Sequence, residues 1–77
     1  MAREIPESRK DAVGKNLRRL IKENPEIRTI ARFAERHGCN ERTAKTWVKE
    51  GIDRLTTISE VALTLGVSDL ELIIGEN

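Results

Sequence analysis

Residues 29–47, TIARFAERHGCNERTAKTW, carry the clearest structural signal in the chain. The first half of this stretch places one face of a helix at positions i, i+3, i+4 and i+7, and these residues are Ile30, Phe33, Ala34 and His37. Thr29 has the residue type of a helix N-cap, and Gly38 has that of the residue that ends a helix. The spacing therefore predicts a short helix over residues 30–37.

The second half of the stretch predicts another helix, over residues 41–50. Asn40 is a favourable N-cap, and Gly51 follows the last helical residue. The inward stripe of this helix consists of Ala44, Trp47 and Val48. Because Gly38-Cys39-Asn40 is the whole connection, the two helices have the form of a helix-turn-helix, in which glycine permits the positive φ of a sharp reversal.

The flanking segments are also helical in pattern. Ser8 and Asp11 have the spacing of an N-cap pair, and the apolar stripe that follows predicts a helix over residues 9–23, which ends before Pro25. Thr57 to Glu60 reads as a capping box for a fourth helix that ends at Gly66. Ser68 to Glu71 is a second capping box and predicts a short fifth helix that ends at Gly75. The fold class we predict is all-α, a compact bundle of five short helices.

The length and composition exclude several classes of protein. A chain of 77 residues forms one small domain, and it is too short for a catalytic barrel or a doubly wound sheet. One cysteine excludes an internal disulfide, and one histidine with one cysteine cannot supply the usual ligands of a structural zinc site. The chain has neither an apolar run of about 18 residues nor the apolar core of a signal peptide. We therefore expect a cytoplasmic protein with no membrane segment, cofactor, metal or small-molecule substrate.

Charge is distributed unevenly along the chain. Residues 1–50 hold 13 Lys and Arg against 8 Asp and Glu, a balance of +5, whereas residues 51–77 have a balance of −4. Such asymmetry favours an anionic partner for the first two-thirds of the chain, although basic solvated helices also occur without one.

The outward face of residues 41–50 carries hydrogen-bonding side chains, and these are Glu41, Arg42, Lys45, Thr46 and Lys49. A ten-residue helix is about 15 Å long and fits a DNA major groove about 12 Å wide. Arg42 can grip guanine O6 and N7, and Glu41 can accept a hydrogen bond from cytosine N4. Thr46 can contact a thymine methyl group, while Lys45 and Lys49 offer point charges to phosphates. The alternative for this basic face is a role in solubility alone.

The start of residues 30–37 offers a second contact region. A helix N-terminus presents free backbone N–H groups and a positive dipole end to a phosphate. Thr29 stands at that terminus, and Arg28 and Arg32 flank it.

Two segments resemble the lambda-repressor-like helix-turn-helix proteins, the Cro and repressor class of phage and bacterial regulators. They are residues 29–47 and the tail of residues 55–73, LTTISEVALTLGVSDLELI. The resemblance covers roughly residues 13–74. It implies DNA base contacts from Glu41, Arg42 and Thr46, with Asn40 and Lys45 beside them, and DNA backbone contacts from Thr29, Thr43 and Lys49. Ile30 departs from the family, where a DNA-contacting glutamine is common, and by period it belongs to the core stripe. The connection after Trp47 lacks the usual proline and is similar to that of phage lysogeny activators.

The hypothesis is a sequence-specific double-stranded DNA-binding transcriptional regulator that acts as a homodimer, formed in solution or only on DNA. Residues 1–8 are expected to be a flexible tail or a DNA-contacting arm, and residues 9–77 the helix-turn-helix domain. The predicted dimer interface consists of Leu70, Leu72, Ile73 and Ile74, because these are more apolar residues than one short helix buries alone.

Two rival classes of function were weighed against this one. The same fold can serve as a protein-interaction module, an antitoxin or an adaptor, that uses its last two helices. An enzyme is not expected, because Cys39 and His37 have no third group to orient them and no phosphate-binding loop or metalloprotease motif occurs. We interpret Trp47 and His37 as packing residues. Arg18, Arg19 and Lys22 are interpreted as solvated, with DNA contact as the alternative.

Overall fold

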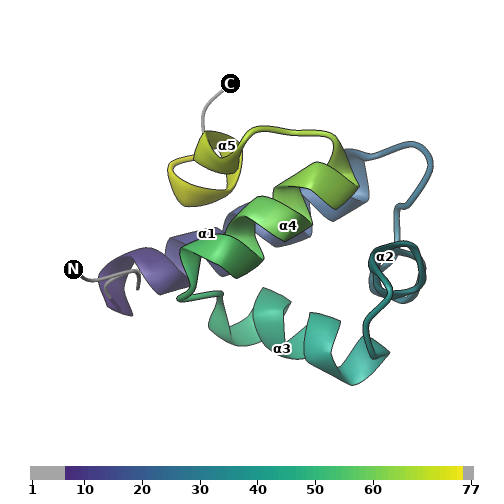
Figure 1. Cartoon of the computed structure of the whole chain (residues 1–77), viewed down its shortest axis with the longest axis horizontal. Helices are drawn as coiled ribbons and strands as arrows, with labels where there is room; N and C mark the ends of the chain where they lie inside the picture. Colours follow the sequence, from purple (N-terminus) through teal and green to yellow (C-terminus); the bar gives the residue numbers. More distant parts are fainter. Residues whose placement is uncertain (1–6, 76–77) are drawn as a thin grey trace.

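The computed structural model of the chain describes residues 7–75. Its helices are α1 (Glu7–Glu23), α2 (Ile30–His37), α3 (Glu41–Glu50), α4 (Leu55–Leu65) and α5 (Asp69–Ile73). The predicted all-α architecture of five helices is confirmed. In Figure 1, α4 crosses in front of α1, α3 runs along the lower edge, α2 is seen nearly end-on, and α5 closes the top of the bundle.

All five helices contribute to one hydrophobic core. The buried apolar residues are Val13, Leu17, Leu20, Ile21, Ile27, Phe33, Ala34, Ala44, Ile52, Ile58, Val61, Ala62, Leu65 and Leu72. Phe33 is the aromatic member of this set, so the packing is almost entirely aliphatic. Trp47, expected in the core, is half-buried and packs against the core from its edge. Burial of these stripes is the main favourable term for folding, because apolar area is removed from water.

The local signals around the helix-turn-helix are confirmed. The Thr29 hydroxyl oxygen accepts a hydrogen bond from the Arg32 backbone N–H at 3.2 Å. The Asn40 side-chain oxygen accepts one from the Arg42 backbone N–H at 2.8 Å. Gly38 has a φ of 85° and turns the chain from α2 into α3. Because only three residues lie between the end of α2 and the start of α3, both helices are held as one unit.

Two predicted helix starts are wrong. Helix α1 begins at Glu7, so Ser8 lies inside it and is not its N-cap. Helix α4 begins at Leu55 with Arg54 as its N-cap residue, and the Arg54 carbonyl accepts the N–H of Ile58 at 3.0 Å. That backbone hydrogen bond is the first of the helix. Thr57 therefore lies inside α4 and is not its N-cap. Residues 1–6 of the predicted tail or arm lie outside the described residues, and the arm stays a prediction.

The start of α5 follows the prediction in position but not in chemistry. Ser68 is the N-cap residue, yet its side chain makes no capping hydrogen bond. Instead, the Ser59 hydroxyl of α4 donates to the Asp69 carboxylate at 2.6 Å, which ties the first residue of α5 to α4.

Helices α1 and α3 approach each other backbone to backbone. A Cβ atom added to Gly14 of α1 would lie 2.8 Å from the carbonyl oxygen of Val48 in α3. At the end of α3, a Cβ on Gly51 would overlap the backbone carbonyl of Lys10, and the φ of 92° at Gly51 also favours glycine. These two contacts set how deeply α3 sits against α1.

Candidate nucleic-acid interface

The outer face of α3 is a continuous polar surface. Its inner residue Ala44 is buried, and Trp47 and Val48 are half-buried. The exposed side chains are Glu41, Arg42, Thr43, Lys45, Thr46 and Lys49, with Glu50 at the end of the helix. All predicted contact residues of α3 therefore lie on the surface of one rigid helix, where a partner can reach them.

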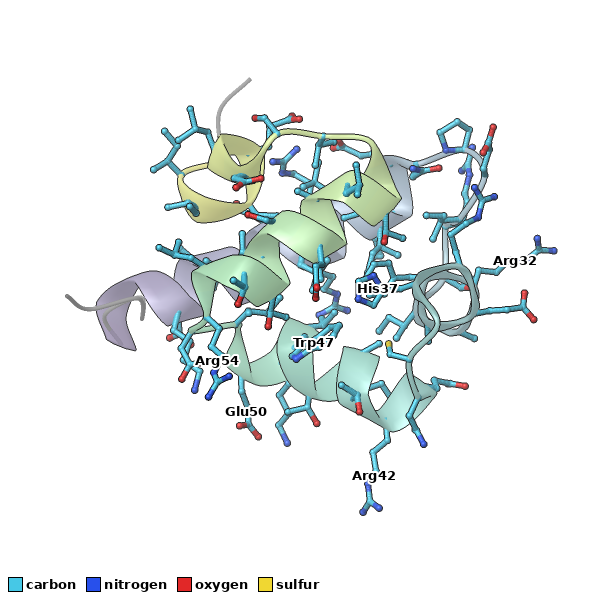
Figure 2. The ribbon with its side chains drawn as sticks, viewed as in Figure 1. Arg32, His37, Arg42, Trp47, Glu50 and Arg54 are labelled. Carbon is cyan, nitrogen blue, oxygen red and sulfur yellow. The ribbon has the colours of Figure 1, made fainter. Side chains whose placement is uncertain are left out.

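Arg42 stands at the centre of this face. Figure 2 shows its guanidinium pointing away from the body of the protein. Among residues 10–75, whose side chains the structure describes, Arg42 takes part in no ion pair, so its five N–H donors face solvent. The Thr46 hydroxyl donates to the Arg42 carbonyl at 3.0 Å, so Thr46 presents an oxygen acceptor and a methyl group rather than a donor.

Other members of the predicted base-reading set are partly engaged. Glu41 and Lys45 form an i, i+4 ion pair with an Nζ to Oε2 distance of 3.3 Å. Both side chains are exposed, so the pair contributes only about 0.3–0.5 kcal/mol to stability and opens readily. Asn40 uses its amide oxygen to cap α3, which leaves its amide N–H groups for an outside acceptor.

The start of α2 forms a second polar region. Thr29 caps the helix, and the backbone N–H groups of Ile30 and Ala31 make no hydrogen bond to the described part of the chain. Arg32 points away from the body of the protein in Figure 2, and Arg28 is exposed. Arg28 also has a φ of 64°, a left-handed conformation that is strained for a residue with a Cβ atom.

An aromatic cluster holds α2, α3 and α4 together behind this surface. The ring of His37 stacks on Phe33 with centroids 5.5 Å apart, and Trp47 meets His37 edge-on at 5.6 Å. His37 Nδ1 lies 2.7 Å from the Thr64 hydroxyl of α4. The same hydroxyl lies 3.1 Å from the Glu60 carbonyl, so Thr64 links His37 to the backbone of α4. This geometry gives His37 and Trp47 packing roles.

Cys39 lies in the turn between α2 and α3 and is half-buried. Desolvation raises the pKa of its thiol, against a smaller lowering by a hydrogen bond with its own backbone. The thiol is therefore neutral at physiological pH and is poorly nucleophilic. In residues 7–75, no three His, Cys, Asp or Glu side chains gather as a set of metal ligands.

The residues predicted to form a dimer interface divide into two groups. Leu70 and Ile74 expose 59% and 43% of their surface, and Ile73 is half-buried. Leu72 is fully buried in the core, so it is not available to a partner at the surface of this chain. Sequence reasoning missed Leu63, which is 83% exposed on α4. Leu63 does not belong to the apolar stripe of Ile58, Val61, Ala62 and Leu65, so the helical period already predicts that its side chain is exposed.

A groove between α1 and α3 is the other feature that the sequence did not suggest. It has a volume of about 570 Å³ and is lined by Lys15 and Arg18 of α1, Ile30 of α2, and Lys45, Val48 and Lys49 of α3. We call it the α1–α3 groove. From the sequence, Arg18 is interpreted as solvated, with DNA contact as the alternative, and Lys15 is assigned no role, because no local pattern predicts which surface of α3 lies opposite them.

No protein-family model and no curated protein matches the chain. A solved structure, that of the hypothetical transcription factor NHTF from Neisseria, aligns over 96% of this chain and 85% of that chain with a TM-score of 0.68. The two sequences are 23% identical, so the likeness shows a shared fold. In the part of the chain that the structure describes, no helix has the length and apolar character needed to span a bilayer.

Proposed function

We propose that the protein is a sequence-specific double-stranded DNA-binding transcriptional regulator of the Cro and repressor type, with α3 as its recognition helix. The observation that carries the proposal is the exposed hydrogen-bonding face of α3, with the unpaired Arg42 guanidinium at its centre. In this proposal Arg42 reads guanine, Glu41 accepts from cytosine N4, and Thr46 contacts a thymine methyl group. A rigid helix suits this task, because base readout requires fixed donor and acceptor positions.

The backbone contacts follow from the start of α2. The free N–H groups of Ile30 and Ala31, with the flanking side chains of Arg28 and Arg32, offer a phosphate both hydrogen bonds and positive charge. Thr43 and Lys49 are the corresponding candidates on α3. The similarity of fold to a protein named as a hypothetical transcription factor supports the same class of function.

A dimer on paired half-sites completes the proposal. One recognition helix reads only a few base pairs, and two half-sites about 34 Å apart give useful specificity. The exposed side chains of Leu70 and Ile74 are the candidates for the contact between the two copies. Such a contact forms in solution if it is strong, and only on DNA if it is weak.

The experiment is a selection from a pool of random duplexes, carried out with the parent and with Arg42→Ala in parallel. Enrichment of a two-fold-symmetric motif by the parent, with loss or relaxation of that motif in the variant, supports a dimeric regulator that reads DNA through α3. If the parent enriches nothing at low salt, the proposal is wrong for the chain as it stands.

A second candidate function rests on a different observation. Leu63 of α4 and Leu70 of α5 are 83% and 59% exposed, which suits a protein-interaction module such as an antitoxin or an adaptor. That function predicts a protein partner whose binding is unchanged by Arg42→Ala and is weakened by Leu63→Ser. Isothermal titration of both variants with a captured partner separates it from DNA binding.

A further inference from the structure

The α1–α3 groove gathers positive charge from two helices that are far apart in sequence. Lys15 and Arg18 come from α1, and Lys45 and Lys49 come from α3. The lining consists of these four cations and two aliphatic side chains, Ile30 and Val48. Like charges brought together repel, so the arrangement suits a ligand that supplies negative charge.

The neighbouring charges do not neutralise the groove. Among the ion pairs of residues 7–75, one involves a groove residue, the exposed pair between Lys45 and Glu41. Arg19 of α1 pairs with Glu23 at 3.3 Å and does not line the groove. Lys15 and Arg18 also border a second hollow along α1, which they share with Arg19, Lys22 and Glu23. Of these five residues, Lys15 and Arg18 are the two that line the groove with α3 as well.

The shape and chemistry of the groove fit a phosphodiester strand. Lysine and arginine bind phosphate oxygens without reading sequence. The aliphatic side chains of Ile30 and Val48 in its lining offer a contact surface for deoxyribose. Ile30 is also the first residue of α2, so the free N–H groups at the start of that helix adjoin the groove.

We propose that the α1–α3 groove holds one phosphodiester strand at the edge of the major groove that α3 enters. This inference rests on the proposed DNA-binding function. Lys15 and Arg18 then contact the DNA backbone. Lys45, predicted among the base-reading residues, contacts the backbone of the same strand in this proposal. The backbone contact between Gly14 and Val48 sets the distance between the two walls of the groove.

The test compares Lys15→Gln/Arg18→Gln with the parent on two duplexes of equal length, the one recovered by selection and a scrambled one. Affinity is measured between 50 and 200 mM salt. Each lost phosphate contact lowers the slope of log affinity against log salt by about 0.9, so the double variant should lose about 1.8. The parent's affinity then falls about 12-fold more than the variant's over this salt range, on both duplexes alike.

The matched control is Arg19→Gln, which removes one charge from the same helix outside the groove. Its slope should stay within about 0.3 of the parent's, because it loses no phosphate contact. Circular dichroism and thermal unfolding of each variant check the fold. As a second measurement, ethylation of single phosphates in the selected duplex should block the parent at groove-contacting positions on one strand of each half-site, and the double variant should lose sensitivity at those positions while keeping it at the phosphates that α2 contacts.

The outcomes separate the two proposals. If the parent enriches a motif that depends on Arg42 but the double variant keeps the parent's salt slope and ethylation pattern, the groove inference is wrong and the proposed function stands. An affinity loss confined to the selected duplex also overturns the groove inference, because a backbone contact acts on every sequence. If the parent binds neither duplex at 50 mM salt, both proposals fail.

Discussion

Gly14 of α1 packs against the backbone of Val48 in α3, and a Cβ atom at position 14 would be 2.8 Å from the Val48 carbonyl oxygen. The same atom would be 3.2 Å from the carbonyl oxygen of Trp47 and from the backbone nitrogen of Gly51. The close approach joins the backbone of the proposed recognition helix to the longest helix of the bundle. Because backbone meets backbone, the distance between α1 and α3 cannot adjust through changes in side-chain conformation.

Gly14→Ala should therefore destabilise the protein. Alanine is favoured over glycine within a helix by about 1 kcal/mol, but here the added methyl group forces α3 away from α1. Overpacking of this kind costs about 1–3 kcal/mol. Urea unfolding followed by circular dichroism measures the net effect, with Lys15→Ala as an exposed control on the same helix. An unfolding midpoint for Gly14→Ala at or above that of the parent would contradict the backbone contact.

Arg28 carries a strained backbone at a position proposed to contact DNA. Its φ of 64° is accessible to glycine without strain, whereas alanine retains the steric cost. Both Arg28→Gly and Arg28→Ala remove the guanidinium, so the two variants should lose the same affinity for DNA. Their stabilities should differ, with the glycine variant more stable by about 1 kcal/mol. Equal unfolding midpoints for the pair would show that residue 28 does not hold a positive φ in solution.

Asn40 joins the capping of α3 to the DNA-facing surface. Asn40→Ala should cost about 0.5–2 kcal/mol of stability, because the Arg42 N–H loses its side-chain acceptor. Asn40→Asp keeps the cap and should retain the parent's stability, but its negative charge should weaken DNA binding. Thermal unfolding and DNA titration of both variants test this separation. A stability loss in the aspartate variant as large as in the alanine variant would argue against the cap.

Arg42 and Lys49 should differ in what they contribute to binding. Arg42→Ala is expected to cost about 1–3 kcal/mol on the selected duplex and to relax one base position. Lys49→Ala should weaken all duplexes by a similar factor and reduce the salt slope by about one. Competition binding with single-base variants of the selected duplex makes the comparison. If Arg42→Ala keeps the specificity profile of the parent, α3 does not read the bases through Arg42.

Cys39 should react slowly with alkylating reagents in the folded protein. Burial raises the pKa of its thiol, so at any pH below that value the folded chain holds less thiolate than the unfolded chain. Because the folded state favours the neutral thiol, this contribution to stability is present below the unfolded pKa and is lost as the pH rises through the folded one. Iodoacetamide modification at pH 8, with and without urea, measures the difference. Equal rates in both conditions would indicate an exposed thiol.

The sequence predicts the helix-turn-helix well because its signals are local. The caps at Thr29 and Asn40 each involve a backbone N–H two or three residues ahead, and Gly38 ends α2 through its own conformation. The apolar stripe of α3 likewise follows from the period of a helix, so the exposure of Arg42 and Thr46 could be foreseen. At Thr57 the local pattern was misleading, because α4 begins earlier with Arg54 as its N-cap residue.

The five helices, the sharp turn between α2 and α3 and the polar face of α3 can all be predicted from local sequence, since they depend on residues within one or two helical turns of each other. The tertiary structure alone decided that Lys15 and Arg18 share a groove with Lys45 and Lys49, and that Leu72 enters the core while Leu63 stays exposed. Those arrangements depend on the depth and angle at which helices pack. The packing is set by contacts such as that of Gly14 with Val48, between residues that the chain separates by more than thirty positions.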